Sequence, residues 1–284
     1  LYMWDIGPEQ ELYLKQLFAM CEQLGIGEID DYMHLAYGFV YLKSGGKMSS
    51  RAGNVISADD LIDEVVKNTK EIIQKSKTER DFSDKEKTEI AEKVALAAVK
   101  YGFLKVARNT DLYFDIDESL ALEGNSGPYL QYTYARTQSV LVKSQTQNPK
   151  SQKNLKFEIG NLKLEINNEE AKLMRQFVHF PEVIENAAKS YSPNLICNYL
   201  YDLAQKFNLF YAKHRILENV DGGPDFAKAS PGREWMADGG RDISPHATHH
   251  PQLTSNFRLA LTSATGFILK NGLNLLGIQT PERM

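Results

Sequence analysis

The feature that most constrains this chain is a change of sequence pattern at Ser57. Before it, residues 2–4 and 33–42 are apolar runs of the length of buried strands, and residues 9–24 have helical periodicity. After it, apolar residues recur almost wholly at helical spacing. Strand, helix and strand in this order are typical of the end of a doubly wound, Rossmann-type parallel sheet. We therefore predict an α/β remnant followed by a mainly α-helical bundle.

Capping residues and prolines set the expected bounds of the helices. Ser57, Ser83 (or Asp84) and Ser192 occupy positions typical of N-caps. We expect helices over residues 57–74, 84–107, 128–143, 169–180, 193–218 and 255–276. Residues 144–168 alternate weakly and are expected to form a small hairpin. Residues 221–252, which carry several Gly and Pro, are expected to form a long loop.

Composition and charge limit the class of protein. With 42% hydrophobic and 25% charged residues the chain is an ordinary globular protein, and no apolar run is long enough for a membrane helix. A formal net charge of −4 argues against a sequence-independent coat on nucleic acid, but it permits an RNA partner bound by a local basic face. Cys21 and Cys197 lie far apart in helical patterns, which favours free thiols and a cytoplasmic location.

A glycine-flanked cationic loop follows the second apolar run, over residues 45–54. Its glycines permit hinge motion, Lys47 supplies a positive charge, and Arg51 can bind two phosphate oxygens at once. Such a loop suits displacement at the α-phosphate of ATP, where negative charge develops in the transition state. The alternative is a solvated turn in which Lys and Ser have no chemical role.

A stripe of side chains accompanies the helix expected from residue 128. Asn125, Tyr129, Tyr132 and Arg136 are spaced by four, three and four residues, which places them on one helical face. An amide, two phenols and a guanidinium can stack an unpaired base, bind its edge and hold a phosphate. The alternative is an amphipathic core stripe with the tyrosines packed inward.

Longer strings reveal a resemblance to a known family. Lys47-Met48-Ser49-Ser50 is similar to the signature loop of class I aminoacyl-tRNA synthetases, and the continuation to residue 55 is closest to the arginyl enzymes. Residues 123–136 resemble the start of their anticodon-binding domain, and residues 272–284 resemble their C-terminus. Ser50 departs from the pattern, because many class I enzymes carry a second lysine there; Arg51 can supply part of that charge.

The resemblance implies an arginine–tRNA ligase whose partners are arginine, tRNA(Arg) and ATP, with Mg²⁺ accompanying the ATP. It implies that residues 1–80 end the catalytic domain and that residues 81–284 form the anticodon-binding domain. We expect a monomer without a membrane segment or a metal site of its own. The implied catalytic residues are Lys47, Ser49, Ser50 and Arg51. The implied ligand contacts are Gly38, Val40, Lys47 and Met48 for ATP, Gln10 for arginine, and Asn125, Tyr129, Tyr132, Arg136, Phe207, Tyr211 and Met284 for tRNA.

Structural alternatives accompany several of these residues. Gln10 is equally compatible with an exposed first-turn position, and His34 suits a core position better than a ligand contact. The long loop contains three histidines, but we expect a polar loop and not a zinc site, because no Cys or acidic residue stands at a ligand spacing from them. They are His246, His249 and His250.

One motif of class I synthetases, His-x-Gly-His, does not occur in the sequence. In the family it lies upstream of the position that Leu1 corresponds to, so we expect a fragment that binds tRNA weakly or moderately and does not aminoacylate by itself. Another class I synthetase, such as the methionyl or cysteinyl enzyme, is disfavoured by the ending. A non-catalytic tRNA-binding module is the remaining alternative.

Overall fold

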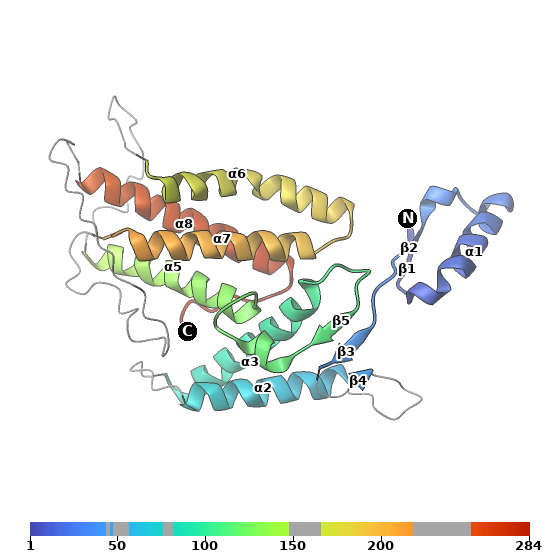
Figure 1. The fold of residues 1–284 in the computed structure, drawn as a ribbon, viewed down its shortest axis with the longest axis horizontal. Helices are drawn as coiled ribbons and strands as arrows, with labels where there is room; N and C mark the ends of the chain where they lie inside the picture. Colours follow the sequence, from blue (N-terminus) through green and yellow to red (C-terminus); the bar gives the residue numbers. More distant parts are fainter. Residues whose placement is uncertain (44–45, 48–56, 76–81, 148–165, 218–250) are drawn as a thin grey trace.

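The first part of the chain is a β-α-β unit. The computed structural model describes residues 1–43, 46–47, 57–75, 82–147, 166–217 and 251–284 (Figure 1). Strand β1 (Tyr2–Trp4) pairs in parallel with β2 (Tyr32–His34), and Trp4 lies opposite His34. Between them lie a 3-10 turn, η1 (Pro8–Gln10), helix α1 (Glu11–Gln23) and a second 3-10 turn, η2 (Ile29–Asp31). The predicted strand–helix–strand order is confirmed.

The prediction of one strand over residues 33–42 is wrong, because two strands of different sheets share this stretch. After β2 the chain leaves the first sheet, and β3 (Val40–Leu42) begins a second one. There β3 pairs antiparallel with β4 (Gly46–Lys47) and parallel with β5 (Leu112–Phe114), a strand that the sequence analysis missed.

The break between β2 and β3 is held by a distant loop. The amide of Gly38 donates to the carbonyl of Arg108 (2.8 Å), and the Arg108 guanidinium donates to the carbonyl of Ala36 (2.5 Å). A Cβ added to Gly38 would overlap with the backbone carbonyl of Thr110. The turn therefore requires a residue without a side chain at position 38.

The rest of the described chain is almost wholly helical. Its elements are α2 (Ala58–Lys75), α3 (Asp84–Leu104), α4 (Ile116–Leu120), α5 (Gly127–Gln147), α6 (Asn168–Lys189), α7 (Asn194–Lys213) and α8 (Pro251–Leu275). Figure 1 shows α5 to α8 side by side, with α3 beneath them and α2 on the far side of α3. The predicted fold class, an α/β remnant followed by a helical bundle, is confirmed.

Two of the predicted capping residues are confirmed and one is wrong. The Ser57 hydroxyl accepts from the amide of Asp60 (3.0 Å), and Ser83 forms a capping box with Glu86. Ser192 does not cap α7, because Pro193 occupies the N-cap position and no side chain caps this end; the Ser192 hydroxyl donates to the carbonyl of Ser190 (3.0 Å).

Two predicted helix ends are wrong by five residues or more, and the ends of α3 and α5 differ from the prediction by three and four residues. Helix α6 continues through Pro181 to Lys189, because Val183, Ile184 and Ala187 keep packing against the core and outweigh the amide that proline lacks. Helix α7 ends at Lys213, after which the backbone is extended at His214. The predicted hairpin lies mostly, and the predicted long loop almost wholly, outside the described residues. Residues 251–252 belong to α8.

Two hydrophobic clusters share α3 as a common wall. The larger one lies within the bundle and includes Tyr101, Leu130, Leu173, Leu200, Phe207 and Leu269. The smaller one joins Leu42, Leu61, Val65, Ala95, Ala98, Leu112, Phe114 and Leu120. The smaller cluster takes residues from both sides of the predicted boundary near residue 80. No helix in the described ranges is both long and apolar enough to span a membrane.

A buried ion pair ties α6 to α8. Glu170 is 1% exposed, and its Oε1 accepts from Arg258 Nε (2.7 Å). Arg258 also donates to the carbonyl of Arg215 (2.8 Å), and Glu170 forms a capping box with Asn167. A buried carboxylate in this position depends on its cation.

We expect Arg258→Met to lower the free energy of unfolding by about 3–5 kcal/mol, because it leaves the Glu170 carboxylate buried without a counter-charge. Urea unfolding followed by circular dichroism measures the change. The double variant Glu170→Gln with Arg258→Met should recover most of the loss, since Gln removes the buried charge and retains the capping box. A single variant as stable as the parent chain would contradict the assignment.

We expect Gly38→Ala to separate β3 from the loop before β5, at a cost of about 1–3 kcal/mol. The amide of Leu112 donates to the carbonyl of Phe39 (2.8 Å), so its hydrogen exchange should accelerate. Gly25→Ala is the control for general destabilisation: the backbone φ of +68° strains an alanine there, but its Cβ would meet nothing within 4 Å, so exchange at Leu112 should stay slow. Unchanged exchange at Leu112 in the Gly38 variant would refute this account.

Candidate functional site

The cationic loop begins at a sheet edge. Lys47 belongs to β4, which is the edge strand of the order β4-β3-β5, and it lies opposite Tyr41. The chain enters α2 through Ser57, whose hydroxyl caps the helix. The remaining loop residues of the prediction, Met48, Ser49, Ser50 and Arg51, lie outside the described residues, as do the three loop histidines.

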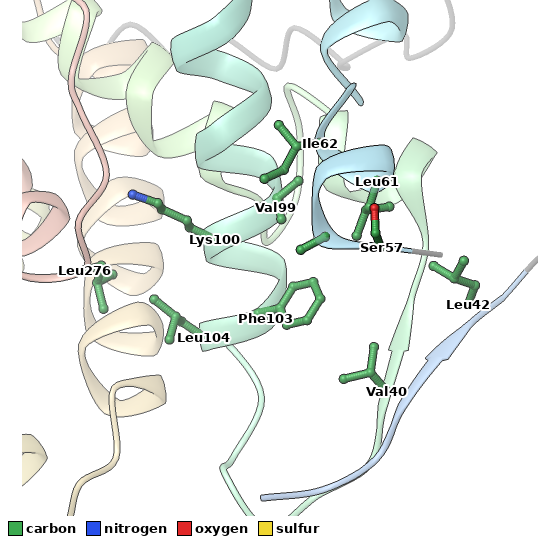
Figure 2. Close-up of a pocket in the computed structure, with 11 residues that line it drawn as sticks. Val40, Leu42, Ser57, Leu61, Ile62, Val99, Lys100, Phe103, Leu104 and Leu276 are labelled. Carbon is green, nitrogen blue, oxygen red and sulfur yellow. The ribbon is translucent and has the colours of Figure 1, made fainter. Parts of the chain in front are cut away.

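One of the predicted ATP contacts, Val40, lines an apolar cavity. Its volume is about 490 Å³, and Figure 2 shows it between β3, α2 and α3. Its lining includes Val40, Leu42, Leu61, Phe103 and Leu276. Such a lining offers little to a phosphate group.

The polar groups near the cavity are engaged elsewhere. The Lys100 ammonium donates to the carbonyl of Gly277 (2.5 Å) and points away from Val40 and Leu42 in Figure 2. The approach of Thr110 already accounts for a glycine at position 38, so the predicted contact of Gly38 with ATP stays a prediction. The contact predicted for Val40 is equally a prediction.

Gln10 and His34 occupy different environments. Gln10 is exposed at the end of the 3-10 turn before α1. His34 is partly buried, and its Nε2 lies 3.0 Å from the carbonyl oxygen of Ile6. This contact supports the structural role that the sequence favoured for His34.

The predicted stripe on α5 meets α7 and forms a cluster of aromatic and polar side chains. The Arg136 guanidinium carbon lies 4.7 Å from the Tyr132 ring centroid and 5.3 Å from that of Tyr211. A cation over the face of a phenol ring is attracted by the ring quadrupole. Tyr129 lies further toward the start of α5 and packs edge-on against Tyr201, with ring centroids 5.8 Å apart. All five side chains are partly exposed, so the cluster reaches the surface.

Asn208 of α7, which the sequence analysis missed, links the members of this cluster. Its Oδ1 accepts from Arg136, and its Nδ2 donates to the Tyr129 hydroxyl (2.9 Å) and to Thr133 Oγ1 (3.1 Å). Asn208 precedes Tyr211 by three residues, so helical spacing alone puts both on one face of α7. That spacing was the available signal. We call Tyr129, Tyr132, Arg136, Asn208 and Tyr211 the α5–α7 cluster.

Burial changes the acidity of two phenols in the α5–α7 cluster. Partial burial raises the pKa of Tyr129 above its usual range, and the hydrogen bond from Asn208 opposes this only in part. Burial likewise raises the pKa of Tyr211, against the opposing influence of Arg136. Both hydroxyls therefore keep their protons at neutral pH.

Three predicted tRNA contacts lie outside the α5–α7 cluster. The Asn125 side chain accepts from the Tyr101 hydroxyl (2.6 Å) and so faces α3, and its role stays a prediction. Met284 is partly buried at the end of the segment that follows α8. A hydrogen bond from Gln131 to the carbonyl of Gln279 (2.6 Å) anchors this segment.

The prediction for Phe207 needs correction. Phe207 and Phe210 are both 0% exposed and belong to the bundle core. A ring without exposed surface cannot stack on a base. Of the aromatic residues predicted on α7, only Tyr211 keeps a surface for contact.

Comparison with known families gives two matches that together cover most of the chain. Residues 1–116 match the catalytic domain of class I tRNA synthetases (R). Residues 130–224 and 247–284 match the DALR anticodon binding domain. The α5–α7 cluster lies almost wholly within the second match, and Lys47 lies within the first.

Curated relatives and solved structures point to the same family. An arginine–tRNA ligase of Flavobacterium psychrophilum is 33% identical over 99% of this chain and 40% of its own length. One from Lactococcus lactis is 34% identical over 99% of this chain and 42% of its own length. The chain thus spans about two fifths of the length of the curated relatives it matches.

Two solved structures share the fold. An arginyl-tRNA synthetase from Thermus thermophilus aligns with a TM-score of 0.64 and 28% identity, over 90% of this chain and 36% of that one. One from Plasmodium falciparum aligns with a TM-score of 0.69 over 99% of this chain and 41% of that one; at 22% identity it shows the fold alone. The chain belongs to the arginyl-tRNA synthetase family, with residues of its class I catalytic domain followed by residues of its DALR anticodon-binding domain.

Proposed function

We propose that this chain serves an arginine–tRNA ligase, which activates arginine with ATP and transfers it to tRNA(Arg). The observation that carries the proposal is the α5–α7 cluster, a surface group of phenol rings and a guanidinium in the DALR match. In the same chain, this DALR match follows a class I match that contains the Lys47-Met48-Ser49-Ser50 string. Rings and a cation suit unpaired bases and phosphate, and the string suits a nucleotide.

In this proposal the loop acts by placing charge. Lys47 and Arg51 stabilise the charge that develops on the phosphates, and Ser49 and Ser50 donate hydrogen bonds to them. Gly38, Val40 and Met48 contact ATP, Gln10 contacts arginine, and Mg²⁺ arrives with the phosphate groups. No covalent enzyme intermediate is required, because positioning and electrostatics supply the rate.

The RNA side of the proposal rests on described residues. Tyr132 and Tyr211 offer aromatic rings that contact the Arg136 guanidinium, Tyr129 offers a hydroxyl, and Met284 contributes from the C-terminal segment. We further propose a boundary near residue 80 and a cytoplasmic monomer. The proposed location is supported by two free thiols, that of the partly buried Cys21 and that of the buried Cys197.

ATP–pyrophosphate exchange by the complete protein, with arginine and tRNA present, tests the catalytic half. Lys47→Ala should slow exchange by about 10²–10³-fold, as removal of one transition-state donor does elsewhere. Lys43→Ala is the matched control, because this lysine pairs with Asp115 (3.0 Å). Exchange with another amino acid in place of arginine would overturn the assignment. Absence of exchange with tRNA still bound would indicate a non-catalytic tRNA-binding module.

Binding of tRNA(Arg) tests the other half. Tyr132→Leu removes a ring that holds Arg136 and can stack a base, so affinity should fall by about 1–3 kcal/mol. Filter binding at fixed salt measures the dissociation constant. Tyr113→Leu, an exposed tyrosine that stacks on Tyr41 in the sheet, should leave affinity unchanged. Equal effects of the two variants would argue against the α5–α7 cluster as the RNA site.

A further inference from the structure

The hydrogen bonds around Asn208 settle which way its amide faces. A guanidinium can only donate, so the Asn208 atom that contacts Arg136 must be the carbonyl oxygen Oδ1. The amino group Nδ2 therefore faces Tyr129 Oη (2.9 Å) and Thr133 Oγ1 (3.1 Å), and it donates to both.

The neighbouring hydroxyl of Thr133 is consistent with this orientation. It donates its own proton to the backbone carbonyl of Tyr129 (2.9 Å), one helical turn earlier. Its oxygen therefore acts as an acceptor toward Asn208. Each partner of the Asn208 side chain then has a defined role: Arg136 is a donor, and the hydroxyl oxygens of Tyr129 and Thr133 are acceptors.

The consequence falls on the Tyr129 hydroxyl. A phenol oxygen that accepts from Asn208 must direct its single proton elsewhere. Among the described residues no acceptor takes that proton. Tyr129, Asn208 and Tyr201 are all partly exposed, so the proton is available to a ligand at the surface.

We propose that Asn208 is a positioning residue that fixes the Tyr129 hydroxyl as a hydrogen-bond donor, so that this part of the site selects an unpaired base with an acceptor, a carbonyl oxygen or an unprotonated ring nitrogen. A base that presents an exocyclic amino group there meets donor against donor. This inference rests on the proposed function, because it assumes that the ligand is RNA.

A purely structural role for Asn208 would have different consequences. In that case the amide only clamps α5 to α7, and its loss would lower the stability of the fold. It would not change which base is preferred. The two roles separate in a comparison of substitutions that keep or reverse the donor.

Tyr129→Phe and Asn208→Asp provide that comparison. Tyr129→Phe keeps the ring and removes the donor. Asn208→Asp keeps an acceptor for Arg136, but its carboxylate can only accept, so the Tyr129 proton turns inward toward it. Tyr129→Phe should weaken binding of the tRNA(Arg) anticodon stem-loop about tenfold, the value of about one hydrogen bond to a base. Asn208→Asp should weaken it at least as much, because its carboxylate also offsets the charge of Arg136. The double variant should be no worse than Asn208→Asp alone, because both changes remove the same donor.

The readout specific to the inference is base selectivity. The full chain is titrated with stem-loops in which one loop base at a time is replaced by an analogue that lacks a carbonyl oxygen or ring nitrogen acceptor. One position should cost the unaltered chain about tenfold in affinity, and the two variants should be indifferent to it. Urea unfolding of each variant reports any loss of the clamp separately.

The outcomes separate the inference from the proposed function. If the unaltered chain does not bind the stem-loop, RNA binding by the α5–α7 cluster fails and the inference fails with it. If it binds and the variants keep both affinity and base selectivity, the inference alone is overturned. Additive losses in the double variant that match losses of stability would establish the clamp and refute the donor.

Discussion

The double burial of α3 is the constraint on which the rest of the structure depends. One side of α3, which carries Ala95 and Ala98, faces the sheet and α2. The other side, which carries Ala97 and Tyr101, faces the bundle. Tyr101 is fully buried, and its hydroxyl lies within hydrogen-bond distance of both Asn125 Oδ1 (2.6 Å) and the Cys197 carbonyl (3.0 Å). One buried phenol therefore fixes the starts of α5 and α7 against α3. The α5–α7 cluster sits on those two helices, so its geometry follows from this internal contact.

Local signals in the sequence were sufficient for most helices and for the stripe on α5. Capping serines, prolines and apolar spacing determine structure within a few residues of themselves, and the confirmed predictions rest on such local signals. The split of residues 33–42 into two strands depends on Arg108, Thr110 and β5, about 70 positions away. No periodicity within residues 33–42 reports such a partner, because non-local pairing leaves no local pattern.

The choice between Phe207 and Tyr211 as a contact residue illustrates the same limit within the site. Both stand on α7 at a spacing of four, so sequence alone places them on one side of the helix. Only the packing of α6 and α8 around α7 decides that Phe207 is enclosed while Tyr211 stays at the rim. Asn208 was missed for a related reason, since its significance lies in the residues of α5 that it meets.

The character of the α5–α7 cluster also reconciles the proposed binding of RNA with a formal net charge of −4. A field of many cations would bind any phosphate backbone and would carry no base information. Here the guanidinium of Arg136 lies over the rings of Tyr132 and Tyr211 and is oriented by an amide that has no charge of its own. A carboxylate at position 208 would orient Arg136 equally well, but it would offset the positive charge that attracts phosphate and withdraw the proton of Tyr129. A neutral amide orients both groups without adding negative charge beside Arg136, and in the proposed site it leaves the Tyr129 donor for the ligand.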